Sequence, residues 1–367
     1  MIPVLVPDLP TADKLLPFFK EIDHSKHYTN FGQFEQKLTA DLERHYFNLH
    51  NTSAKATLTN SGTSALQLAL LSLNAGPGTR VLVPNFTFPA TVTAALTLGC
   101  EIVLGDVDDK TGFLDIEDAL SHSSDFDIMI PVACMGKVLP CNDFIKIANE
   151  QNKALISDCA PAFPYHPLCG LTTFSFHATK PFGIGEGGLL LNEQEIRSAK
   201  QITNFGFLEH QVNSIGNNFK LNEYSAAIGL AQLTRLTEIG QQRKTIYQKL
   251  KDSLSYLDET CFFYSDDETI LENFSYPYFI LRFDDPTIIE AITTQFQQAK
   301  IGLRRWYYPT IIEHPYFSNH ERIRSLNDLK TSKKLASQLI GIPMHNFLTD
   351  SDIKLISKNI KKVISHV

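Results

Sequence analysis

The sequence has no excess of positive charge, no long apolar run and no paired-cysteine motif. Its 367 residues include 33 Lys and Arg against 40 Asp and Glu, for a net charge of −7. A mildly acidic chain has no electrostatic footprint for nucleic acid or for an anionic membrane surface. No apolar stretch approaches the ~20 residues that span a bilayer, and residues 1–10 lack the features of a signal peptide. We therefore expect a cytoplasmic protein with neither nucleic-acid nor membrane partners.

Cysteine and histidine occur in no pattern that is typical of a metal site. None of the six cysteines belongs to a Cys-x-x-Cys pair, and several lie in apolar, strand-like segments. Small buried hydrophobic residues in a reducing compartment explain these cysteines better than a disulfide framework or a zinc site. His314 and His320 flank an aromatic segment in no recognised ligand spacing, so we expect no metal.

Short apolar segments alternate with helical patterns over about residues 55–205. Strands are expected at 56–59, 80–84, 101–104, 127–133 and 154–157, with helices between them at 64–73, 89–98 and 142–151. Strands and helices that alternate in this way predict an α/β fold with a mostly parallel central sheet covered on both faces.

The pattern changes after residue 222. A long helical pattern covers 223–254, and it is followed by a strand at 276–282 and by helices at 287–300 and 350–365, the last capped by Thr349. We predict a large domain with an N-terminal arm over residues 1–225, a connecting helix over 226–254, and a smaller α+β domain over 255–367.

The segment Asn60-Ser-Gly-Thr-Ser64 joins a strand to a helix and can therefore bind an anion. Gly62 lets the backbone approach closely, the free amides of the helix start point at the anion, and Thr63 and Ser64 add hydroxyl groups. Ser175 adds another small hydroxyl that can reach the same phosphate. On this motif alone the plainer interpretation, an N-capped helix after a strand, stays open.

Lys180 lies among apolar and small residues, and Asp158 ends an apolar strand. A lysine amine in such surroundings can hold an aldehyde cofactor as a Schiff base, while a carboxylate can hold the protonated ring nitrogen of that cofactor. Asp158 can instead cap a turn, and most lysines are solvated. Residues 183–188 also match G-x-G-x-x-G, but they run into the strand-like residues 189–191 where a phosphate-capping helix is needed, which argues against a nicotinamide or flavin site.

A series of motifs extends along nearly the whole chain. They are Thr29-Asn-Phe-Gly32, Asn60-Ser-Gly-Thr-Ser-Ala-Leu66, Pro84-Asn-Phe-Thr-Phe-Pro-Ala-Thr91, Ile130-Pro-Val132, Asp158-Cys-Ala160, Phe174-Ser-Phe-His-Ala-Thr-Lys180, Gly216-Asn-Asn-Phe-Lys-Leu-Asn-Glu223, Arg304-Arg-Trp-Tyr-Tyr-Pro309 and Ile342-Pro-Met-His345. In order and spacing they resemble the DegT/StrS-type nucleotide-sugar aminotransferases.

This resemblance implies a fold and a set of roles. The fold is that of PLP-dependent transferases of the aspartate aminotransferase type, in a homodimer whose active sites lie at the subunit interface. Lys180 is the Schiff-base lysine for pyridoxal 5'-phosphate, Asp158 is the partner of the pyridinium nitrogen, and Phe88 stacks on the ring. The residues that hold the phosphate are Gly62, Thr63, Ser64 and Ser175, together with Asn218 from the other subunit. Arg304 is a candidate to hold the sugar nucleotide, and His177 lies close to the site.

The activity implied is transfer of an amino group from L-glutamate to a keto group of a nucleotide-linked (deoxy)sugar, for surface polysaccharide or glycoconjugate synthesis. Two alternatives keep the fold: a PLP-dependent sugar dehydratase and a non-catalytic sensor. The dehydrating branch replaces the lysine by histidine, so Lys180 favours aminotransfer, and the intact lysine, aspartate and phosphate set argues against a mere binder. Two features depart from the family: Pro161 stands where many members have Gln or His, and the segment 163–173 is shorter than usual.

Overall fold

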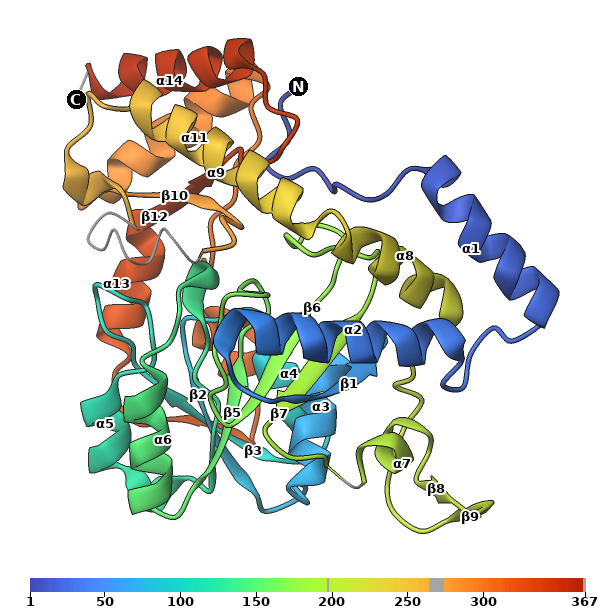
Figure 1. The fold of residues 1–367 in the computed structure, drawn as a ribbon. Helices are drawn as coiled ribbons and strands as arrows, with labels where there is room; N and C mark the ends of the chain where they lie inside the picture. Colours follow the sequence, from blue (N-terminus) through green and yellow to red (C-terminus); the bar gives the residue numbers. More distant parts are fainter. Residues whose placement is uncertain (197, 264–273, 366–367) are drawn as a thin grey trace.

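The computed structural model describes residues 1–196, 198–263 and 274–365, and its centre is a large β-sheet (Figure 1). Within these residues the sheet has eight strands in the order β1-β7-β6-β5-β4-β2-β3-β11. The strands are β1 (Lys55–Thr59), β2 (Arg80–Pro84), β3 (Glu101–Gly105), β4 (Ile128–Met129), β5 (Ala154–Asp158), β6 (Leu171–Ser175), β7 (Gly188–Asn192) and β11 (Ile323–Ser325). β7 pairs antiparallel with both β1 and β6, whereas the other described pairings in the sheet are parallel.

The central strands of this sheet are buried on both faces, as the apolar runs predict, whereas the edge strand β11 is largely exposed. In β2, Val81 and Val83 belong to one apolar cluster and Leu82 belongs to the other. One face packs against α3 (Gly62–Ser72), α4 (Pro89–Leu96) and α7 (Ala199–Thr203), and the other against α2 (Gln33–His50), α5 (Ile116–Ser121) and α6 (Cys141–Glu150). The predicted α/β architecture with a mostly parallel central sheet is therefore confirmed.

The helical pattern over residues 223–254 is two helices in the structure, α8 (Glu223–Leu233) and α9 (Leu236–Ser253). The Thr234 hydroxyl donates to the Ala231 carbonyl at 2.8 Å, a local bond of the kind that bends or ends helices. Arg235 turns towards the N-terminal arm and donates to Asp8 Oδ1 at 2.7 Å. A single connecting helix over this range was therefore wrong, because side-chain bonds outweigh the apolar periodicity at the junction.

A second, two-stranded sheet lies beyond these helices. β10 (Phe279–Arg282) pairs antiparallel with β12 (Leu339–Ile342), and α9, α11 (Pro286–Ala299), α13 (Lys330–Gln338) and α14 (Asp350–Ile364) lie around it (Figure 1). The strands predicted at 276–282 and 127–133 are each shorter in the structure. The Thr349 hydroxyl accepts a bond from the Asp352 amide at 3.2 Å, which confirms the predicted cap of α14. The boundaries at residues 225 and 254 stay a prediction.

The smaller elements lie at the periphery. They are α1 (Ala12–Ser25), α12 (Pro315–Ser318) and the hairpin of β8 (Phe207–Leu208) and β9 (Gln211–Val212). β11 comes late in the chain, yet it completes the edge of the large sheet beside β3. None of the helices that the structure describes is long and apolar enough to cross a membrane.

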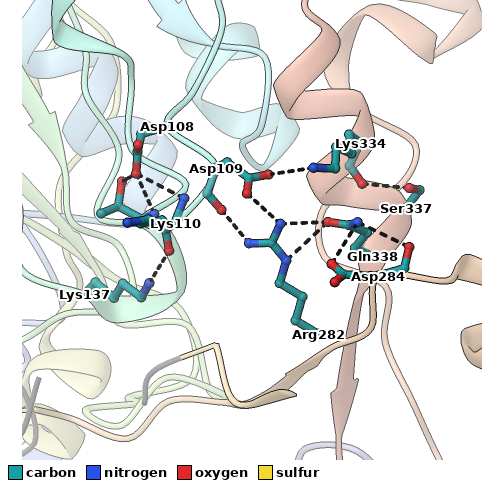
Figure 2. Close-up of polar contacts among 10 residues, drawn as sticks. Asp108, Asp109, Lys110, Lys137, Arg282, Asp284, Lys334, Ser337 and Gln338 are labelled. Atoms are coloured by element: carbon teal, nitrogen blue, oxygen red, sulfur yellow. Dashed lines mark hydrogen bonds and ion pairs between the residues drawn. The ribbon is translucent and has the colours of Figure 1, made fainter. Parts of the chain in front are cut away.

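A polar cluster joins the two sheets (Figure 2). Arg282 of β10 donates through Nη2 to Asp109 Oδ2 at 2.7 Å and through Nη1 to the Asp109 carbonyl at 2.7 Å. The same guanidinium donates to Gln338 Oε1, and Lys334 lies 3.8 Å from Asp109 Oδ1. Arg282 therefore ties the loop after β3 to the second sheet and to α13, with planar charge-assisted bonds of the stronger kind.

Candidate active site

A cavity of about 420 Å³ opens where the strands β1, β2, β5 and β6 end. These strands point in one direction, so their carboxyl ends meet at one edge of the sheet, where open α/β sheets place their ligands. The opposite wall comes from the N-terminal arm and from the region of the second sheet. The lining includes Val4, Ser61, Gly62, Thr63, Thr87, Phe88, Asp158, Ser175, His177, Lys180, Tyr278, Arg304, Trp306 and Tyr307.

Asp158 is the last residue of β5, and its side chain is buried in the cavity wall. Its carboxylate accepts a bond from the Thr91 hydroxyl at 2.8 Å and from the Ala160 amide at 3.1 Å. Thr91 in turn bonds Thr87 at 2.8 Å. Burial raises the pKa of the Asp158 carboxyl, and these two bonds together with the charge of Lys180 oppose that rise. A carboxylate held in this way is a natural partner for a cationic group in the cavity.

Lys180 lies in the loop between β6 and β7. Main-chain bonds across the loop hold it as a narrow turn, with Phe176 N bonded to Gly187 O at 2.8 Å and Ala178 N to Gly185 O at 2.7 Å. Within the turn, the Lys180 amide donates to the His177 carbonyl at 2.8 Å. The Lys180 Nζ atom reaches into the cavity, where it donates to the Tyr278 hydroxyl at 3.0 Å.

The start of α3 forms the narrow end of the cavity. A Cβ atom added to Gly62 would lie 2.8 Å from the Ser175 Cβ, so only glycine lets the helix start approach the end of β6 this closely. Ser61 caps α3, and its hydroxyl accepts from the Ser64 amide at 3.1 Å. Gly62, Thr63 and Ser175 line the cavity, which suits a phosphate because the first amides of a helix are free donors.

Three other predicted residues line the cavity. Phe88 is the N-cap residue of α4, is 59% exposed and lines the cavity. His177 is half-exposed, bonds the Thr179 hydroxyl at 2.9 Å and lies 3.7 Å from Glu186. Arg304 is exposed and lies at the opposite wall.

The structure does not bring two predicted residues into the cavity lining. The Ser64 hydroxyl donates to Asn60 Oδ1 at 2.6 Å, and Ser61 takes its place at the wall. The Asn218 carbonyl accepts from the Asn60 side chain at 2.9 Å, outside the lining of the same subunit. The role of Asn218 was predicted for the partner's site, and both roles stay predictions.

Several lining residues were missed by sequence reasoning. Thr87, which lines the cavity, and Thr91, which bonds Asp158, lie in the motif after β2, where their hydroxyl groups were the available signal. Tyr278 lies within the predicted strand at 276–282, and nothing in the sequence indicates that its side chain meets Lys180. Trp306 belongs to the motif at residues 304–309. A Cβ atom on Gly341 of β12 would lie 2.3 Å from the Trp306 ring, so the ring fits here because residue 341 is glycine.

These residues fit pyridoxal phosphate. The cavity volume is in the range of small cofactor sites. At one end the Gly62 cradle leaves room and donors for a phosphate, and at the other the buried Asp158 carboxylate can hold a protonated ring nitrogen. Lys180 lines the same cavity, and its amine is the group that would form the Schiff base with the aldehyde of such a cofactor.

Comparison with known proteins identifies relatives over nearly the whole chain. The DegT/DnrJ/EryC1/StrS aminotransferase family model matches residues 12–361. A dTDP-4-amino-4,6-dideoxy-D-glucose transaminase from Shigella dysenteriae is 29% identical over 373 residues, which is 98% of each chain. A UDP-2-acetamido-2-deoxy-3-oxo-D-glucuronate aminotransferase from Pseudomonas aeruginosa is 28% identical over 81% of this chain and 82% of its own.

Solved structures share the architecture. The crystal structure of a Bacillus cereus protein assigned as a PLP-dependent aminotransferase superposes with a TM-score of 0.86 at 26% sequence identity, over 98% of this chain and 99% of that chain. The predicted fold of PLP-dependent transferases is therefore confirmed.

Proposed function

Because this chain belongs to the DegT/DnrJ/EryC1/StrS aminotransferase family, we propose that it transfers the amino group of L-glutamate to a keto group of a nucleotide-linked sugar, with pyridoxal phosphate as cofactor. The observation that carries this proposal is the pairing of Lys180 and Asp158 in one cavity whose far end is the Gly62 cradle. The aminated sugar would then serve surface polysaccharide or glycoconjugate synthesis.

Lys180 and Asp158 perform the chemical work. Pyridoxal phosphate, when bound, supplies an electron sink that stabilises negative charge on the amine-bearing carbon. Asp158 keeps the ring nitrogen protonated, which suits a carboxylate whose only described hydrogen-bond donors are Thr91 and the Ala160 amide. Lys180 Nζ, as a free amine, takes a proton from the α-carbon of the donor and returns a proton during product formation.

The remaining cavity residues orient the cofactor. Gly62, Thr63 and Ser175 hold the phosphate at the start of α3, as the close approach of Gly62 to Ser175 supports. Phe88 stacks on the cofactor ring through its exposed face. Ser64 contributes through the cap that it forms with Ser61 and Asn60.

The acceptor enters against the opposite wall. Arg304 is the cation there and holds the diphosphate of the sugar nucleotide, while His177 borders the sugar. The transaminases from Shigella and Pseudomonas act on dTDP- and UDP-linked sugars by their names, which supports a nucleotide-linked acceptor.

We further propose a homodimer in which Asn218 reaches the phosphate of the partner subunit. The hairpin β8–β9, close to Asn218 in sequence, presents exposed Phe207, Leu208 and Val212, and exposed apolar side chains of this kind suit an interface.

The six cysteines are free thiols, which supports a reducing compartment such as the cytoplasm.

The test is a panel of nucleotide-linked keto-sugars, each incubated with the purified holoenzyme and L-glutamate and followed by mass spectrometry. We expect at least one sugar to gain an amino group in step with release of 2-oxoglutarate. Glutamate alone should release one 2-oxoglutarate per active site, which a water-eliminating enzyme need not do. Retention of every sugar unchanged, despite that release, would point to a non-sugar acceptor.

A further inference from the structure

The amine of Lys180 has one close polar partner among the described side chains, the hydroxyl of Tyr278. The distance from Lys180 Nζ to the Tyr278 oxygen is 3.0 Å, and Nζ lies 5.7 Å from the centre of the Tyr278 ring. Tyr278 is only 6% exposed, and its bond with Lys180 is partly buried. The two residues come from opposite walls of the cavity, one from the large sheet and one from the segment before β10.

Tyr278 is held in place from behind. Arg243 of α9 is buried, and its guanidinium donates to the Tyr276 carbonyl at 2.9 Å and to the Pro277 carbonyl at 3.0 Å. The Ser275 hydroxyl donates to the Pro161 carbonyl at 2.9 Å, which ties the same segment to the loop after Asp158. The main chain that carries Tyr278 is therefore fixed to α9 and to the loop after β5 within three residues.

The ring of Tyr278 is also packed in position. Its centre lies 4.4 Å from that of Trp306, with the two ring planes tilted by 43°. Tyr307 is close by, and burial raises the pKa of its hydroxyl well above the ordinary value. The titratable and charged groups around Tyr278 are thus Lys180, Tyr307 and Arg243, with Asp158 and Cys134 beyond Tyr307. This packing leaves the Tyr278 hydroxyl aimed at Lys180.

We propose that Tyr278 is the positioning residue for Lys180: its hydroxyl holds the amine at the reaction site whenever Nζ is not bonded to the cofactor. This inference rests on the role of Lys180 in the proposed function. A hydroxyl can do this in both protonation states of the amine, because its oxygen accepts from an ammonium and its proton can be donated to a neutral amine. Nζ thus keeps a partner before and after it gives up a proton.

Positioning matters because a lysine side chain is long and flexible. A free lysine amine samples many rotamers, and ordering such a side chain costs up to about 2 kcal/mol. A displacement of about 1 Å at a reacting group can cost about 100-fold in rate. Pro161, beside the site, offers no side-chain hydrogen bond, so the hydroxyl that orients Lys180 comes from across the cavity.

The test compares Tyr278→Phe with Tyr308→Phe. The first removes the hydroxyl on Lys180 and keeps the ring on Trp306, while the second removes an exposed tyrosine hydroxyl from the same region. One readout needs no substrate: the cofactor is stripped from the holoenzyme, and its covalent reattachment to Lys180 is followed by visible absorbance. The other is the single-turnover release of 2-oxoglutarate from saturating glutamate, measured across pH.

We expect Tyr278→Phe to slow reattachment about 10-fold, with the final cofactor content unchanged. Single turnover should fall about 10-fold to 100-fold with a shifted pH profile, while the KM for glutamate changes less than about twofold. Tyr308→Phe should match the wild type. Ser275→Ala removes the bond to Pro161 and so loosens the segment, but it keeps the Tyr278 hydroxyl. We expect it to slow reattachment and single turnover about threefold. This variant replaces Tyr278→Phe as the test if Tyr278→Phe does not fold.

Wild-type rates of reattachment and single turnover in Tyr278→Phe would overturn the proposal. So would a change confined to KM or to thermal stability, because that is what mere packing against Trp306 would produce. If the wild type releases no 2-oxoglutarate, the proposed function fails, but the reattachment rates still decide the role of Tyr278.

Discussion

The two walls of the cavity are built in different ways. The wall formed by the large sheet consists of short motifs at strand ends. Local bonds such as Ser61 with Ser64 and Asp158 with the Ala160 amide shape each motif, and the bond from Thr91 to Asp158 joins two of them. The opposite wall combines Val4, Tyr278 and the pair Arg304 and Trp306, which come from three segments far apart in sequence. Arg304 is placed there by main-chain bonds to Gly341 of β12, at 3.0 and 2.7 Å.

This difference separates cofactor from substrate. The wall of the large sheet presents a phosphate cradle, a carboxylate and an amine, which are the groups that pyridoxal phosphate needs whatever the acceptor is. The opposite wall presents aromatic rings and one arginine, which suit the recognition of a particular acceptor. Substitutions on the first wall should therefore affect every substrate. Those on the second should affect mainly the acceptor, with the exception of Tyr278, which contacts Lys180.

The largest effect is expected from Lys180→Ala. Removal of the amine eliminates both the covalent attachment of the cofactor and the proton transfer, so we expect the turnover number to fall at least about 1,000-fold. Glutamate-dependent release of 2-oxoglutarate measures it. Lys55→Ala on β1, an exposed lysine, is the control and should keep full activity. Lys180→Ala protein that still aminated its acceptor would contradict the role of Lys180 and, with it, the contrast between a cofactor wall and a substrate wall.

Asp158→Asn should lower turnover about 100-fold and should also change how stability depends on pH. In the cofactor-free protein burial raises the Asp158 pKa, so the folded state binds this proton more tightly than the unfolded state. The stability that the protonated Asp158 carboxyl contributes to the folded state is therefore lost as pH rises from the ordinary pKa of 3.8 through the raised pKa.

Urea unfolding of the cofactor-free protein at several pH values tests this sign. The stability of Asp158→Asn relative to wild type should grow with pH across that window, and Thr91→Val, which removes a bond to the carboxylate, should enlarge the loss in the wild-type background. A relative stability that fell with pH would show that Asp158 is stabilised as a carboxylate by the protein itself.

Arg304→Ala sharpens the comparison from the opposite wall. We expect the KM for the sugar nucleotide to rise about 10-fold, because one charge-assisted bond to phosphate is lost. The glutamate half-reaction should be unchanged. Steady-state kinetics on the acceptor and single turnover with glutamate measure the two separately. Arg44→Ala, an exposed arginine of α2, is the matched control. An equal loss in both half-reactions would mean that Arg304 serves the cofactor wall.

The smallest effect on activity is expected from Arg282→Ala, which removes the link between the sheets shown in Figure 2. Arg282 is largely buried, and its loss leaves Asp109 and Gln338 without their donor, so the free energy of unfolding should fall by about 1–3 kcal/mol. Turnover should stay within about twofold. Arg324→Ala, which breaks an exposed pair with Asp125, should cost less than about 1 kcal/mol. Chemical denaturation compares the two variants.

Much of the fold was predictable because strand and helix periodicities are local. The strands at 80–84 and 154–157 and the cap at Thr349 appear where the apolar pattern and the capping residue indicate. The break between α8 and α9 was not predictable, because it depends on the Thr234 hydroxyl and on Asp8, a residue from the other end of the chain. The pairing of β11 with β3 was not predictable either, because it joins two segments that are far apart in the chain.

For the site, the sequence by itself determined the cofactor side: a helix start with Gly62, a carboxylate at the end of β5 and a lysine in the next loop. Each of these is recognisable from a short local motif, although the fold then adds long-range contacts such as that of Thr91 with Asp158 and that of Gly62 with Ser175. Only the tertiary structure decided what Lys180 meets, because Tyr278 and Trp306 approach it through the docking of the second sheet, held by Arg243, Ser275 and Gly341. Contacts made by packing of distant segments leave no local pattern in the sequence.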